Sequence, residues 1–410
     1  MNIISETNKS NYIIKLTPLI LVYILILLIF GSEPVGDETR YIFHAQNLWQ
    51  GFVNPEKLLL ANGPGYPFII WPLVSAGASL FWIRFLNLIF IFLATIFFYK
   101  TLKHYTSKKS AIIFSYIFGL YPTFFPEAVK VLTEPATIFL VSTLMYQIVR
   151  PSENIKRKQI ITASIILAFL ILTKVIFAYI IIIAIIMTLL FSYRWRGWKK
   201  FMIILGLSLL LCTPYLIKTY QATGKIFYWS YVGGSSLYWA SNPYPEQYGD
   251  WKNNNRVFQE EIYAPHKEFF LTLPQDDHVK QAELFTQKAI ENIKLYPQKY
   301  FYNWLTNFGR LWFAYPHTNT LQRPATLGYM FVNGVLFTFL IVTSYSLWKQ
   351  RRKVAPEIWP IIGFTIITLA ATSLIHALPR YLNTLIPILL FLIFYTFSQI
   401  ISVSWHKRDN

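Results

Sequence analysis

Two adjacent carboxylates follow the first apolar segment of the chain, within the stretch Gly36-Asp37-Glu38-Thr39-Arg40-Tyr41. Placed on a helix, Asp37 or Glu38 shares a face with Tyr41, because residues three and four apart are neighbours there. A carboxylate beside a phenol at a membrane surface could act as a general base. In the structural alternative, the two acids only favour the amino end of a helix.

A second acidic stretch, Thr133-Glu134-Pro135, opens a later apolar segment. It could simply begin a helix, since Thr is a good cap and Pro suits the first turn. If this stretch lies on the same membrane face as Asp37, the two loops bring carboxylates together. Such a pair predicts general-base chemistry or a divalent cation held by Asp37 and Glu134. The sequence points to no other cofactor.

Two cations lie in short turns on the same predicted face. Lys174 separates two apolar segments, and Arg380 belongs to His376-Ala377-Leu378-Pro379-Arg380-Tyr381, before the last one. Either side chain could snorkel to the lipid headgroups. Cations are disfavoured in outer turns, so these two indicate an anionic partner at the outer leaflet. A lipid-linked phosphate is such a partner. Arg offers phosphate a planar fork, and Lys offers a point charge.

The composition places these residues in a polytopic membrane protein. The 410 residues are 54% hydrophobic and only 14% charged, far from the balance of a soluble domain. The net charge of +18 falls in loops between apolar segments, which indicates membrane topology rather than binding to nucleic acid. The single cysteine, Cys212, excludes an internal disulfide.

About ten transmembrane helices are predicted, with both termini in the cytoplasm. Every second connection is basic, as the positive-inside rule requires, and this alternation splits 160–192 into two spans instead of one long helix. The predicted spans are 13–31, 81–102, 110–126, 133–149, 160–173, 175–192, 200–219, 326–348, 357–376 and 381–403.

Two long outer connections divide the chain into three regions. An amino-terminal transmembrane module, 1–219, includes the first outer loop, 32–80, where Pro-containing apolar segments predict helices lying on the membrane surface. An outer region, 220–325, carries aromatic residues and a helical pattern with a break at Pro297. The carboxyl-terminal spans occupy 326–410.

The ordered motifs resemble the GT-C class of integral-membrane glycosyltransferases, in the family 39-like branch similar to bacterial protein O-mannosyltransferases and the lipid A aminoarabinose transferase. The stretches that carry the resemblance are spread over nearly the whole chain. They are Asp37 to Tyr41 with Ala45 and Gly51, Gly63-Pro64-Gly65-Tyr66-Pro67, Leu132 to Pro135, Ala289 to Trp312, and His376 with Arg380-Tyr381-Leu382 and Pro387.

This resemblance implies an all-helical GT-C bundle that transfers a sugar from a polyprenyl-phosphate donor to a lipid, glycan or protein acceptor. The transfer would invert the anomeric centre at the outer face of a bacterial cytoplasmic membrane. By the same resemblance Asp37 would be the general base and Glu38 the second catalytic acid, although either could be the base.

The resemblance also assigns the remaining site residues. The donor phosphate would be held by Arg380, Lys174 and Arg40. The residues expected to line the substrate pocket are Tyr41, Glu134, His376 and Tyr381.

The rival function is a secondary transporter or a lipid-linked sugar flippase. Such proteins place acids and bases inside the spans near the midplane, on broken helices in paired repeats. Here the spans are almost free of ionisable residues, which favours chemistry at one surface. A membrane scaffold without chemistry leaves Lys174 and Arg380 unexplained.

Overall fold

The chain is described here by a computed structural model covering residues 12–30, 36–54, 58–149, 157–190, 198–319 and 324–399. All regular secondary structure within these ranges is helical. Five of the described helices are long and apolar enough to cross a membrane: Tyr12–Phe30, Leu80–Leu102, Trp198–Thr223, Pro324–Lys349 and Pro356–Ile375. The protein is therefore a helical membrane protein by composition and by structure. The ends of the chain, with their predicted cytoplasmic placement, lie outside the described residues.

The amino-terminal module follows the predicted order of apolar segments. Its elements are α2 (Pro18–Phe30), α3 (Asp37–Gln46), α4 (Leu48–Val53), α5 (Gly65–Ser75), α6 (Leu80–Leu102), α7 (Lys108–Gly119), η2 (Pro122–Phe124), α8 (Phe125–Ala128), α9 (Glu134–Val149), α10 (Arg157–Thr173), α11 (Ile176–Leu190) and α12 (Trp198–Thr223).

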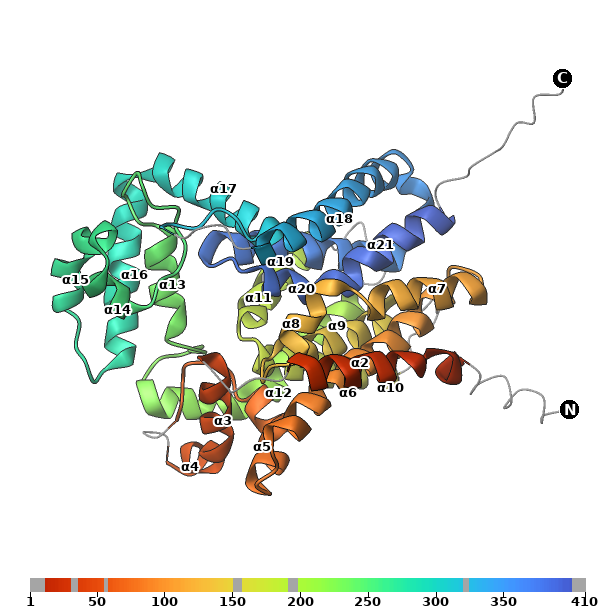
Figure 1. Ribbon diagram of the computed structural model, residues 1–410, viewed down its shortest axis with the longest axis horizontal. Helices are drawn as coiled ribbons and strands as arrows, with labels where there is room; N and C mark the ends of the chain where they lie inside the picture. The colour runs from red at the N-terminus through yellow and green to blue at the C-terminus, as the bar shows by residue number, and fades with distance from the viewer. Residues whose placement is uncertain are drawn as a thin grey trace, which may run out of the picture.

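The outer region forms a separate group of helices at one end of the molecule, and the apolar helices extend away from it (Figure 1). Its elements are α13 (Val232–Ala240), α14 (Asn254–Gln259), η4 (Glu261–His266), α15 (Lys267–Leu271), α16 (His278–Leu295) and α17 (Pro297–Phe313). The last part of the chain contains α18 (Pro324–Lys349), η5 (Arg351–Lys353), η6 (Pro356–Ile358), α19 (Trp359–Ile375), α20 (Pro379–Asn383) and α21 (Ile386–Gln399).

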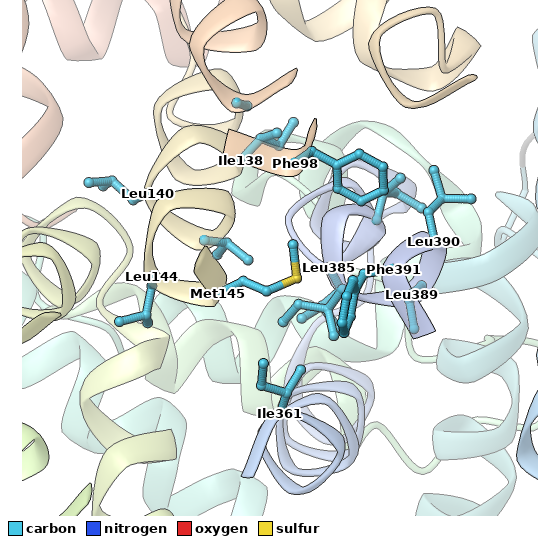
Figure 2. Packing of buried hydrophobic residues seen from close by; sticks show 14 of the residues in the cluster. Phe98, Ile138, Leu140, Leu144, Met145, Ile361, Leu385, Leu389, Leu390 and Phe391 are labelled. Atoms are coloured by element: carbon cyan, nitrogen blue, oxygen red, sulfur yellow. The ribbon is translucent and has the colours of Figure 1, made fainter. Parts of the chain in front are cut away.

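Helix α9 is the central element of the apolar bundle. It packs against α6, α10 and α21, and most of its side chains are buried. Figure 2 shows Met145 of α9 facing Phe391 of α21, with Ile361 of α19 nearby. A helix that is apolar on every side is expected in such a position. The first residue of this buried helix is Glu134, so the bundle fixes that carboxylate firmly.

Two predicted spans are interrupted in the structure. The segment 110–126 is helical only to Gly119, after which Tyr121 is extended and Pro122 starts η2. A residue before proline is disfavoured in the α conformation, which accounts for the break. The segment 381–403 is likewise divided, into α20 and α21. The short helix α20 carries Arg380.

The stretch Gly63-Pro64-Gly65 packs directly against the end of α10. A Cβ atom on Gly63 would lie 2.0 Å from the carbonyl oxygen of Leu172, and one on Gly65 would lie 2.6 Å from the amide nitrogen of Thr173. Only glycine allows backbones to approach so closely. This contact brings the first outer loop against the turn that carries Lys174.

We predict that Gly63→Ala destabilises the protein by about 1–3 kcal/mol, because overpacking forces the two backbones apart. Thermal unfolding of the purified chain in detergent measures this loss. Gly328→Ala is the matched control, since its Cβ would meet no atom within 4 Å. Equal melting temperatures for the two variants would show that the close approach at Gly63 is not a constraint.

Candidate functional site

Asp37 and Glu38 occupy the first turn of α3, but neither caps the helix. The cap residue is Gly36, with a positive φ of 59°, and no side chain accepts a cap hydrogen bond there. The amphipathic helix turns the two adjacent carboxylates toward different surroundings. Their roles therefore have to be argued separately from their contacts.

The carboxylate of Asp37 is held by two arginines. Arg40 Nη2 lies 2.8 Å from Asp37 Oδ1, and Arg380 Nη2 lies 2.7 Å from Oδ2. Burial alone would raise the pKa of Asp37, but the charges of Arg380 and Arg40 outweigh burial and lower it. Asp37 is thus an ionised acceptor, and both of its oxygens are engaged.

Arg380 also faces the second acid of the site. Its Nε lies 3.8 Å from Glu134 Oε1, and Lys174 Nζ lies 2.8 Å from the same oxygen. Glu134 is almost completely buried, at 2% exposure, so its charge depends on these cations. The Arg380 Nε–H has no hydrogen-bond acceptor among the described residues.

These charged groups surround a cavity of about 310 Å³. Three cationic side chains and two carboxylates line it, which leaves a net positive charge in a partly enclosed space. Its size is within the range of small-molecule sites. All of the predicted site residues except Glu38 line it: Asp37, Arg40, Tyr41, Glu134, Lys174, His376, Arg380 and Tyr381.

Glu38 lies outside this cavity. Its carboxylate accepts hydrogen bonds from Arg84 Nη2 at 3.1 Å and from the backbone N–H of Val131 at 2.8 Å, and only 1% of the residue is exposed. These contacts join α3 to α6 and to the segment before α9. The position does not suit the catalytic role expected of Glu38, because its carboxylate does not reach the cavity.

The three aromatic pocket residues pack close to the cations. The ammonium of Lys174 lies 4.5 Å from the ring centre of Tyr381, and the His376 ring meets Tyr381 edge-on at 5.5 Å. Tyr41 contacts Tyr66 in the same edge-on manner at 5.4 Å. Burial, followed by the charges of Arg380 and Arg310, lowers the pKa of His376 to about 3. The imidazole is therefore neutral at physiological pH.

Two neighbours of the site are not among the predicted site residues, although the sequence places Glu127 in the same acidic outer loop as Glu134. Trp251, from the loop before α14, lines the cavity beside His376. Glu127 of α8 is nearly buried, and burial followed by the charge of Glu134 raises its pKa to about 7. The Pro126-Glu127 pair could have indicated the second residue, whereas no local pattern marks Trp251.

A divalent cation has little support from the donor groups. Within the described ranges, no three His, Cys, Asp or Glu side chains are grouped closely enough to hold a metal ion. Asp37 and Glu134 are bridged by Arg380, so a guanidinium stands where a cation shared by the two carboxylates would be placed. These residues do not fit a metal, and no step of the chemistry below is routed through one.

The comparison with known families adds one finding. A family model described as a domain of unknown function (DUF8201) matches residues 70–260. The matched segment contains Glu134, Lys174 and Trp251, whereas Asp37 and Arg380 lie on either side of it. No curated protein matches the chain.

We predict that Glu134→Gln costs about 3–5 kcal/mol of stability, because it leaves Lys174 and Arg380 buried without their shared carboxylate. Adding Lys174→Gln should recover part of this loss, since it removes one uncompensated charge. Thermal unfolding of the single and double variants measures the coupling. The control is Glu291→Gln in the exposed pair with Lys288, where less than about 1 kcal/mol is expected. Additive losses at Glu134 and Lys174 would contradict the coupling.

His376 supplies a prediction on pH. The folded pKa of about 3 lies below the ordinary value of 6.5, so the unfolded chain binds more protons between these limits. Stability from His376 is complete above pH 6.5 and decreases as the pH falls, by at most about 1.4 kcal/mol per pH unit. His376→Gln should therefore lose less stability than the native chain between pH 6.5 and 4.5. Parallel pH profiles would mean that His376 is not held neutral.

Proposed function

We propose that the protein transfers a sugar from a polyprenyl-phosphate donor to an acceptor hydroxyl at the outer face of the membrane. One observation carries this proposal: the carboxylate of Asp37 shares a single cavity with the cations Lys174 and Arg380. A base for the acceptor and cations for a phosphate leaving group are what such a transfer requires. The ordered motifs of the GT-C class support the same chemistry.

A separate apolar groove suits the lipid part of such a donor. It has a volume of about 920 Å³ and lies between α7, α18 and α21, with Phe331, Val335 and Phe339 in its wall. Pro122, at one end of the groove, precedes Thr123, whose hydroxyl donates to Asn383 Oδ1 of α20 at 2.6 Å. Helix α20 therefore lies next to both the groove and the cationic cavity, as a donor with a charged head and an apolar tail requires.

The proposed reaction is a single displacement at the anomeric carbon. The acceptor oxygen forms a bond to that carbon while the bond from the carbon to the phosphate oxygen breaks. The proton of the acceptor hydroxyl passes to Asp37, and the polyprenyl phosphate leaves with its negative charge held by Lys174 and Arg380. Attack from the face opposite the leaving group inverts the configuration.

Donor binding would also prepare the base. Without a ligand, Arg40 and Arg380 occupy both oxygens of Asp37 and lower its pKa. A phosphate competes for Arg380, because a phosphate oxygen is a strong acceptor for a guanidinium. Once Arg380 has released it, Asp37 Oδ2 can take up the proton of the acceptor hydroxyl. Asp37 therefore becomes available as a base only when the donor is bound. This limits protonation of its carboxylate at times when no transfer can follow.

The proposal includes the topology of ten spans, with the site on the outer side of a bacterial cytoplasmic membrane. Helices occur at all ten predicted ranges, and several of them are shorter than a full span. The positive-inside pattern of the loops supports this orientation. Lipid, glycan and protein remain the acceptor classes to compare.

The test is transfer of radiolabelled sugar from a panel of polyprenyl-phosphate sugars to endogenous acceptors in membranes. Asp37→Asn should reduce transfer at least about 100-fold, because general-base catalysis typically contributes 100-fold to 10,000-fold. Asp277→Asn is the matched control, since Asp277 Oδ1 only caps α16 by accepting from the Lys280 N–H.

Each outcome of this assay has a clear meaning. Equal transfer by the native chain and Asp37→Asn, with both folded, would remove Asp37 as the base. Transport of a lipid-linked sugar across proteoliposomes without any transfer would favour the flippase alternative instead.

A further inference from the structure

Trp251 is a large aromatic side chain in the wall of the charged cavity. It lines the cavity together with Asp37 and Arg380, and it is 40% exposed. Its indole N–H has no hydrogen-bond partner among the described residues. What distinguishes Trp251 from other exposed aromatic residues is its place in the wall of the charged cavity, where an aromatic side chain can contact the apolar part of a ligand.

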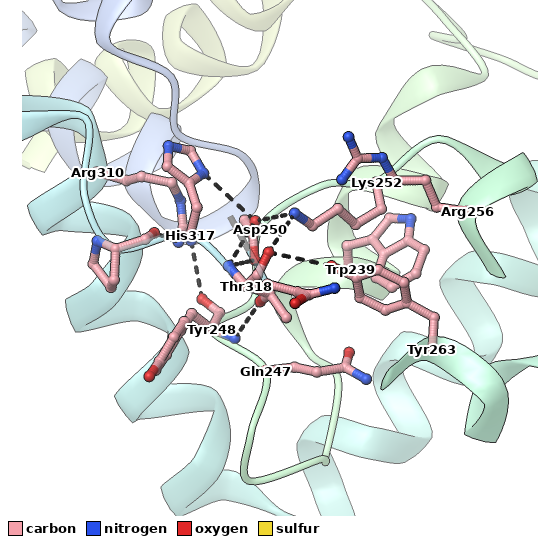
Figure 3. Close-up of polar contacts among 12 residues, drawn as sticks. Trp239, Gln247, Tyr248, Asp250, Lys252, Arg256, Tyr263, Arg310, His317 and Thr318 are labelled. Atoms are coloured by element: carbon pink, nitrogen blue, oxygen red, sulfur yellow. Dashed lines mark hydrogen bonds and ion pairs between the residues drawn. The ribbon is translucent and has the colours of Figure 1, made fainter. Parts of the chain in front are cut away.

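The residues on either side of Trp251 are fixed by a buried polar network (Figure 3). Lys252 Nζ lies 2.8 Å from Asp250 Oδ2 and donates to the carbonyl oxygen of Thr318 at 3.0 Å. The backbone N–H of Thr318 donates to both oxygens of Asp250 at 3.2 Å. Asp250 and Lys252 are each 6% exposed. The backbone is therefore held on both sides of Trp251 by contacts inside the protein.

An aromatic series connects Trp251 with the phosphate-binding cations. The Trp251 and His376 rings are stacked, with centres 6.2 Å apart and planes 28° apart. His376 in turn meets Tyr381, and the ring of Tyr381 contacts Lys174 and Arg380. Trp251 and Arg380 line the same cavity, so a ligand with its phosphate at Arg380 has Trp251 in the wall around it.

We infer that Trp251 is the platform on which the sugar of the donor stacks, an assignment that rests on the proposed function. The C–H bonds on one face of a pyranose ring are apolar, and an aromatic face buries them while the hydroxyl groups stay hydrated. The free indole N–H is a donor for a ring hydroxyl. Because the backbone is held on both sides of Trp251, less entropy is lost on binding.

A membrane anchor is the competing explanation for an exposed tryptophan. Anchoring residues lie at the lipid interface and face the headgroups. Trp251 instead shares a cavity with Asp37, Glu134 and Arg380, and its neighbours Asp250 and Lys252 are buried in protein. Its surroundings fit a ligand better than a lipid surface.

Binding of bare and sugar-carrying lipids to the full-length chain in nanodiscs separates these explanations. The probes are undecaprenyl phosphate and the same lipid carrying mannose, glucose or 4-aminoarabinose. Native protein should bind at least one sugar-carrying lipid more tightly than the bare lipid. Trp251→Ala should weaken that complex at least tenfold and change binding of the bare lipid less than twofold, while Trp251→Phe retains most of the affinity.

Trp359→Ala is the matched control, because Trp359 is 42% exposed and does not line the cavity. Its binding of both lipids should equal that of the native chain. If Trp251→Ala weakens both lipids equally, or neither, the stacking role is wrong while the phosphate site stands. Native protein that binds every lipid equally would overturn the stacking role as well. Binding of no lipid at all would overturn the proposed function and the stacking role together.

Discussion

The structure depends on the pairing of charges at the end of an apolar bundle. An ionised carboxylate or guanidinium without a partner costs several kcal/mol in such surroundings, so each must be compensated. Arg380 meets this requirement for two acids at once, because it contacts Asp37 and faces Glu134. Through these pairs the starts of α3 and α9 are held against α20, elements far apart in the sequence. A phosphate bound at Arg380 would therefore change the ion pairing of both carboxylates in the cavity.

The sequence predicted the charged residues that line the cavity, because membrane topology constrains where charge can lie. Asp37, Glu134, Lys174 and Arg380 were predicted on one face, and the structure brings them around one cavity. Topology places Asp37 and Glu38 on the same side of the membrane, so it could not predict which of them faces the cavity. Successive residues of a helix point about 100° apart, and only one of the two can face it. Glu38 consequently turns inward to Arg84. Its burial follows from tertiary contacts that no local pattern records.

Other features depended on contacts between distant segments. Trp251 is placed by the bonds from Asp250 to Thr318, which lies 68 residues away in sequence. Apolar composition predicted where helices occur but not where they break, as at Pro122 and at the end of α20. These breaks bring Thr123, which follows the groove residue Pro122, into a hydrogen bond with Asn383 of α20, the helix that also carries Arg380. The arrangement of the cavity and the groove therefore depends on both local backbone preference and long-range packing, and neither predicts it alone.

The central claim is that the cavity holds the phosphate of a polyprenyl lipid while the groove holds its chain. Photocrosslinking with two diazirine-bearing polyprenyl phosphates tests it most directly. A diazirine next to the phosphate should label α20 and the turn at Thr173–Lys174, and one along the chain should label the groove walls on α7, α18 and α21. Excess unlabelled polyprenyl phosphate should abolish both patterns. Labelling that falls elsewhere, or that survives competition, would contradict the account.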